Sequence, residues 1–87
     1  MIKGHAEKAE YYLIRESIAG KYEGGRYYIH DQGRWVPDDR SMIFERLIGF
    51  DRSEPSDSPY AVGNPDIIDE IRKISYEELV RFIGRKR

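Results

Sequence analysis

The sequence has 87 residues, enough for one small hydrophobic core and too few for two, which predicts a single domain over 1–87. Because cysteine is absent, disulfides, thiol nucleophiles and Cys-ligated metal centres are excluded, whereas 13% aromatic residues indicate a folded chain. The formal net charge of -1 leaves no overall field to attract nucleic acid or an anionic membrane.

The first predicted element follows a polar N-terminal segment. Residues 1–9 contain few bulky apolar side chains, so we expect them to fray. Residues 10–16 (EYYLIRE) concentrate β-forming side chains, which favours a strand whose successive side chains face opposite ways. The alternative is a helix over 6–19, in which the alanines and Leu13 share one stripe and Gly20 caps the end. We favour the strand because the tyrosine pair and the neighbouring isoleucine outweigh the alanines.

Glycine-containing turns separate three further runs of β-forming residues: 18–23, 26–30 and 34–36. Gly24 and Gly25 suit a tight hairpin turn, because both central residues of a type I′ turn need positive φ. The second turn, 31–33, has glycine at its last position, which predicts a type I turn followed by a G1 bulge. Pro37 ends the last run because proline cannot donate to the ladder. These runs predict an antiparallel meander of three or four strands.

An amphipathic helix is predicted over 39–48, where Asp38 or Asp39 can cap the N-terminus. Its apolar residues recur at helical spacing and share one broad face: Met42, Ile43, Phe44, Leu47 and Ile48. If Gly49 is the left-handed residue at the C-terminus, Phe50 packs against Phe44 in a Schellman ending.

Residues 51–65 contain three prolines, three serines and one glycine, a composition that excludes a regular element. We expect a long mobile loop, with Tyr60 and Val62 holding it to the core, or else a partner site. Residues 66–74 fit a helix capped by Asn64, or a strand that returns to the meander. We favour the strand, because a new helix start follows directly.

That helix start is a capping box, with Ser75 at the N-cap and Glu78 three residues later. The helix is predicted over 76–83 and ends at Gly84. Its inward side chains are predicted to be Tyr76, Leu79, Val80 and Ile83. The basic tail 84–87 complements the helix dipole, or else contacts a phosphate or an acidic partner. The predicted fold class is α+β: a small antiparallel meander packed against two short amphipathic helices.

No motif predicts phosphate or metal binding. We interpret the glycines at 20, 24, 25 and 33 as turn residues, because Lys21 is followed by tyrosine where a phosphate-binding loop needs serine or threonine. His5 and His30 lack the spacing of shared metal ligands. We therefore expect neither a metal nor a cofactor.

The pairs His30-Asp31 and Asp38-Asp39 are the only candidates for acid–base chemistry. Both are expected at exposed turns, where nothing moves a pKa toward neutrality, and the second pair serves as a helix cap. No serine lies in a nucleophile motif. We therefore do not expect an enzyme.

Adjacent tyrosines are the remaining signal, at positions 11–12 and 27–28. Neighbouring side chains on a strand face opposite ways, so one ring of each pair must face away from the helices. These rings either stabilise an exposed sheet face or form a docking surface with nearby arginines. The candidate surface residues are Tyr12, Arg26, Tyr28, Arg34, Trp35 and Tyr60.

The sequence thus predicts a non-enzymatic interaction module that binds another protein or an identical subunit through this surface. The alternative is weak binding of single-stranded nucleic acid, with the rings stacking on bases and Arg85, Lys86 and Arg87 contacting phosphates, although the net charge counts against it. A small enzyme is the third and least favoured function. The longest apolar run, Tyr11–Ile14, is far below the roughly 20 residues of a membrane span, so we expect a soluble cytoplasmic protein without a membrane partner.

Overall fold

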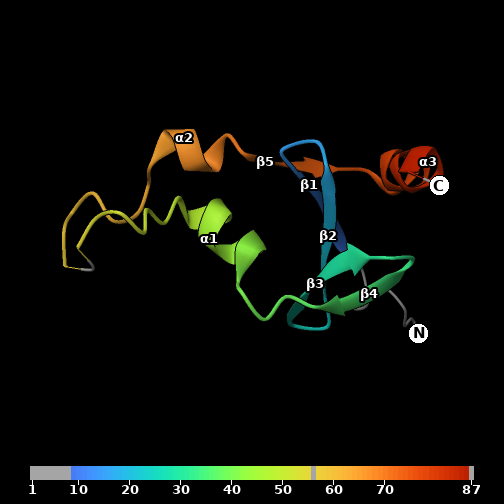
Figure 1. Ribbon diagram of the computed structural model, residues 1–87, viewed down its shortest axis with the longest axis horizontal. Coiled ribbons are helices and arrows are strands. Elements are labelled where there is room, and N and C mark those ends of the chain that lie inside the picture. The colour runs from blue at the N-terminus through green and yellow to red at the C-terminus, as the bar shows by residue number, and fades with distance from the viewer. Residues whose placement is uncertain (1–8, 56, 87) are drawn as a thin grey trace, which may run out of the picture.

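The structure, a computed structural model, describes residues 9–55 and 57–86 (Figure 1). The predicted frayed segment 1–9 lies, apart from Ala9, outside the described residues. In chain order the elements are β1 (Glu10–Ile14), β2 (Ile18–Glu23), β3 (Arg26–Asp31), β4 (Arg34–Pro37), α1 (Met42–Ile48), α2 (Pro65–Ile68), β5 (Ile71–Ile74) and α3 (Tyr76–Lys86). None of these helices is long and apolar enough to cross a membrane.

The strands form one antiparallel sheet in the order β4-β3-β2-β1-β5. The first four strands are the predicted meander, and β5 joins its free edge beside β1. The α+β class is therefore confirmed, while the sheet has five strands rather than three or four. Residues 66–74 combine the two structures that we weighed, because α2 ends at Ile68 and β5 begins at Ile71.

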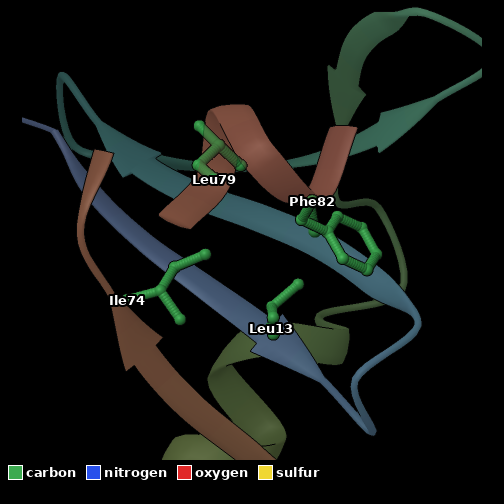
Figure 2. Close-up of a cluster of buried hydrophobic side chains, with 5 residues drawn as sticks. Leu13, Ile74, Leu79 and Phe82 are labelled. Carbon is green, nitrogen blue, oxygen red and sulfur yellow. The ribbon is translucent and has the colours of Figure 1, made fainter. Parts of the chain in front are cut away.

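The helices cover both faces of the sheet, since α1 and α3 lie on opposite sides of it (Figure 1). We call these sides the α1 face and the α3 face. Under α3, one buried cluster contains Leu13, Ala19, Ile74, Leu79 and Phe82 (Figure 2). Under α1, the other contains Tyr12, Ile14, Ile43 and Ile71. Successive residues of β1 thus enter different clusters, as strand alternation requires.

Local signals account for both ends of α1. The Asp38 carboxylate accepts hydrogen bonds from the backbone N–H groups of Met42 and Ile43 at 3.0 and 2.9 Å, so the predicted aspartate cap is confirmed, although the helix begins at Met42. Gly49 has a φ of 67°, and the Phe50 N–H donates to the Glu45 carbonyl at 2.8 Å. The Gly49 N–H donates to the Arg46 carbonyl at 3.2 Å, and the two bonds together confirm the Schellman ending.

The terminal helix differs from its prediction in length and in the side that it buries. The Glu78 N–H donates to Ser75 Oγ at 3.1 Å, as expected of the cap. Gly84 does not end the helix, which continues to Lys86. Phe82 is buried beside Leu79, whereas Tyr76 and Val80 are exposed. The prediction was wrong because it aligned the inward stripe on the tyrosine, whose polar hydroxyl is better left in water.

Two glycine predictions also need correction. Gln32 and Gly33 have φ values of 53° and 84°, so the β3–β4 connection is a two-residue turn with both central residues at positive φ, without the predicted bulge. Gly20 is not a turn residue, because it pairs with Tyr12 and Ile29 in the middle of the sheet. The prediction for Gly24 and Gly25 is confirmed by their φ values of 61° and 82°.

The segment between α1 and α2 is held by a residue that the sequence did not single out. Ala61 is buried, and its carbonyl accepts a hydrogen bond from the Asp51 N–H at 2.7 Å. Tyr60 and Val62 are 73% and 54% exposed, so they do not hold this segment to the core. Its mobility stays a prediction.

Candidate functional site

Two tight turns bring the residues of the candidate site to the α3 face. The Gly24-Gly25 turn pairs Lys21 of β2 with Tyr28 of β3. The second turn pairs His30 of β3 with Trp35 of β4. Because side chains alternate along each strand, Lys21, Tyr28, His30 and Trp35 all project from the face that carries α3.

The ammonium group of Lys21 lies between aromatic rings and a carboxylate. Its Nζ is 4.7 Å from the ring centroid of Trp35 and 5.4 Å from that of Tyr28. The same atom donates to Glu23 Oε1 at 2.7 Å. The Lys21 side chain is only 16% exposed, an unusually low value for a lysine on a sheet face. We call Lys21, Glu23, Tyr28 and Trp35 the cation–aromatic site.

His30 extends this site toward the end of α3. Its ring meets the Trp35 ring edge-on, with centroids 5.0 Å apart. Beyond it, a cleft of about 450 Å³ separates the β3–β4 turn from the last turns of α3. The cleft is lined mainly by Ser17, Ala19, His30, Gln32, Phe82 and Ile83. The site therefore combines a half-buried ring surface with an adjoining hollow.

The structure brings together half of the predicted surface residues. Tyr28 and Trp35 are half-buried in the cation–aromatic site, and Arg26 is exposed beside it, directly opposite Glu23. Arg34 precedes Trp35 on β4 and so belongs to the other face. Tyr60 lies in the loop between α1 and α2, at the far end of the molecule from β4 (Figure 1).

Tyr12 was wrongly predicted to be exposed, since it is buried under α1. The expectation assumed that helices cover one face only, whereas α1 and α3 cover both faces at β1. The Tyr12 hydroxyl donates to Glu10 Oε1 at 2.9 Å. Burial, reinforced by this hydrogen bond to a carboxylate, raises the pKa of Tyr12 to about 12. The same bond and the nearby Lys73 lower the pKa of Glu10.

A second group of rings lies on the α1 face. Tyr27 stacks at a tilt on Tyr22, with centroids 4.7 Å apart, and its ring is 6.4 Å from that of Phe44 in α1. Burial, and secondarily Tyr22, raises the pKa of Tyr27. Tyr22 and Phe44 are 36% and 47% exposed, so this group also adds apolar surface. It contains no cation.

The described residues show no arrangement of metal ligands. Within 9–55 and 57–86, no three histidine, cysteine, aspartate or glutamate side chains come close enough to hold a metal ion. Asp38 of the second acid–base candidate pair serves as the helix cap. The clearest chemical feature of the described surface is therefore the cation–aromatic site.

Comparison with known protein families, curated proteins and solved structures finds no match. The function must therefore be argued from the site itself, since a fold class alone does not imply an activity.

Lys21 and Glu23 were not among the predicted surface residues, although the sequence carries a signal for both. The glycine pair at 24–25 sets the register, so residue 23 pairs with 26 and residue 21 with 28. A lysine opposite a tyrosine, with a glutamate two residues along the same strand, then predicts a cation held on an aromatic face. The position of Trp35 could not be predicted as easily, because it depends on the type of the β3–β4 turn.

Proposed function

We propose that this protein is a non-enzymatic interaction module that binds another protein through the α3 face of β2, β3 and β4. One observation carries the proposal: the half-buried rings of Tyr28 and Trp35 lie on this face within reach of one cation, with Lys21 Nζ 5.4 and 4.7 Å from their centroids. Tryptophan, tyrosine and arginine are the residues most enriched at the energetic centres of protein interfaces.

Neighbouring residues support the same surface. Arg26 is exposed at its edge, and α3 adds the exposed side chains of Tyr76 and Val80. The Tyr76 ring lies 5.7 Å from that of Tyr11, which stands beside Lys21 across β1 and β2. Aromatic and apolar surface thus continues from β4 across the sheet to α3, which a docking partner can cover.

The experiment compares two variants of the full chain. Arg26→Ser combined with Tyr28→Ser removes two side chains of the proposed surface. Tyr60→Ser is the matched control, because Tyr60 is more exposed but lies in the loop at the other end of the molecule. Sedimentation velocity measures self-association. Crosslinking in the cells that naturally express the protein, followed by affinity capture, measures binding to other proteins.

We expect the double variant to lose the crosslinked partner of the parent, while Tyr60→Ser retains it and both variants keep the circular dichroism spectrum of the parent. If the double variant and the parent show the same sedimentation and the same crosslinked proteins, the proposal is wrong.

Binding of single-stranded nucleic acid is the second candidate, and one observation favours it. Phe82 and Ile83 line the cleft next to His30, so the last turns of α3, with exposed Arg85, lie at the same face as the rings. Stacking on the rings would then combine with phosphate contacts from α3. Labelled single strands titrated at low and high salt test this, because phosphate binding must weaken steeply as salt rises.

A further inference from the structure

The cation–aromatic site has the three components that recognise an organic ammonium group. Two ring faces attract a cation through their quadrupoles, and a carboxylate neutralises its charge. Here the two rings belong to Tyr28 of β3 and Trp35 of β4, and the carboxylate belongs to Glu23 of β2. The ammonium group that contacts them is that of Lys21 in the same chain. Lys21 thus places a primary alkylammonium group on these rings.

Lys21 can leave the rings at small cost. Lys21 and Glu23 stand two residues apart on the same face of one strand. Lys21 can therefore move into solvent while an incoming ammonium takes its place at the Glu23 carboxylate, so that one ion pair replaces another. What is lost is the contact with Trp35 and Tyr28, and a cation–π contact changes an equilibrium constant by about two- to fivefold where it is exposed and by more where it is desolvated. Displacing Lys21 therefore weakens an incoming ligand by at least about tenfold.

We propose that Glu23, Tyr28 and Trp35 form a binding site for an alkylammonium group that the partner presents on a lysine side chain, and that Lys21 fills this site in the free protein. The inference deepens the proposed function and rests on it, because it names the group through which the partner engages the face. An N-methylated lysine suits the site best, since methylation keeps the charge and makes the ammonium easier to take out of water.

The first experiment uses choline as a quaternary ammonium probe and 3,3-dimethylbutan-1-ol as its uncharged counterpart. Trp35 is the only tryptophan of the chain, so its fluorescence reports binding at the rings. Ionic strength is held constant with sodium chloride, because surface charges are screened by salt. We expect Lys21→Ala to bind choline at least about tenfold more tightly than the parent, since the internal competitor is gone.

The matched control is Lys73→Ala, which removes an exposed lysine of β5 that pairs with Glu10. It should bind choline as the parent does. Adding Glu23→Gln to Lys21→Ala should weaken choline binding about three- to fivefold, the effect of one exposed ion pair, without changing the binding of the uncharged alcohol. If Lys21→Ala and the parent differ by less than about twofold for choline, or if the alcohol binds equally well, the inference is wrong.

A second measurement uses the unmodified protein and so does not depend on the folding of any variant. Because Lys21 Nζ lies over the Trp35 ring, the ring current should move the Lys21 ε-methylene proton resonances upfield. Saturating choline should return them to the position typical of a solvated lysine, whereas the alcohol should not. If saturating choline leaves the Lys21 ε-methylene resonances at their upfield positions, Lys21 is not displaced and the proposal is wrong.

The two proposals fail separately. If choline displaces Lys21 but the Arg26→Ser, Tyr28→Ser variant keeps every crosslinked partner, the ammonium site exists and the proposed docking function is wrong. If partner binding depends on Tyr28 but choline never competes with it, the docking function stands and the ammonium site is wrong.

Discussion

Gly20 of β2 lies directly against Ile43 of α1: a Cβ atom placed on Gly20 would be 2.6 Å from Ile43 Cδ1. Ile43 is fully buried, so it cannot move into solvent to make room. The backbone of Gly20 is extended and paired on both sides, so the glycine is required by the close approach of α1 and not by its own conformation. Helix α1 therefore packs closely against the sheet at this contact.

Gly20→Ala should lower the free energy of unfolding by about 1–3 kcal/mol, because the added methyl group overpacks a filled core. Ile43→Val alone should cost about 1 kcal/mol, yet in the Gly20→Ala background it should restore part of the stability, since it removes the clashing Cδ1 atom while Cγ1, 3.1 Å from the added methyl group, stays. Denaturant unfolding of the four proteins in this cycle measures the coupling. Additive effects would contradict the contact.

Gly84→Ala is the control for the glycine-to-alanine change itself. Gly84 lies in α3, and a Cβ atom added to it would have no described side chain or neighbouring element within 4 Å, so alanine fits there freely. We expect it to raise the free energy of unfolding by up to about 1 kcal/mol through helix propensity. The opposite signs at positions 20 and 84 then separate packing from propensity.

Asp38 and Asp39 provide a second matched pair. Asp38 accepts two backbone hydrogen bonds from the first turn of α1, whereas Asp39 is exposed and its side chain makes no hydrogen bond among the described residues. Asp38→Ala should lower the free energy of unfolding by about 1–2 kcal/mol through loss of the cap. Asp39→Ala should change it by less than about 0.5 kcal/mol, as expected of surface substitutions. Equal effects in thermal unfolding would show that Asp38 is not the cap.

The features that could be predicted from the sequence depend on neighbours along the chain. The cap at Asp38, the left-handed Gly49 and the Gly24-Gly25 turn each follow from local backbone chemistry. Features that depend on distant segments were missed. The burial of Tyr12 under α1 is one example. A strand that returns to the meander was predicted, but the sequence did not say that it would pair with β1.

The β1–β2 turn shows why local signals can fail. Arg15 and Glu16 have φ values of 53° and 57°, although glycine is absent from this turn. The unfavourable backbone is compensated by the segment around β5: the Arg15 N–H donates to the Glu70 carbonyl at 2.6 Å, and Arg72 donates twice to the Glu16 carboxylate, at 2.6 and 2.9 Å. Such compensation can be recognised only once the position of β5 is known.

Gln32 occupies a left-handed position that another residue would fill better. Its φ is 53°, and an Asn-Gly pair is the preferred sequence of a turn with two positive φ values. Gln32→Asn should therefore raise the free energy of unfolding by about 0.5–1 kcal/mol. Chemical denaturation measures the change, with Gln32→Val as the opposite control because a β-branched residue is disfavoured at positive φ. A stabilising valine would contradict the turn geometry.

The raised pKa of Tyr12 predicts how the stability of the protein changes at high pH. Its pKa is raised from 10.0 to about 12, chiefly by burial and then by the hydrogen bond to Glu10. Because the folded state holds the proton more tightly than the unfolded state, the stability that this group contributes is fully present below pH 10 and is lost as the pH rises to about 12.

Ultraviolet absorbance of tyrosinate should show this late ionisation directly. Tyr12→Phe should remove one equivalent from the titration near pH 12 and should flatten the fall in stability between pH 10 and pH 12. The late contribution of Tyr27, whose pKa burial also raises, should persist in this variant. Glu10→Gln removes only the carboxylate, so most of the rise in the Tyr12 pKa should remain. A titration that Tyr12→Phe leaves unchanged at high pH would place Tyr12 in contact with solvent and contradict the burial of its ring under α1.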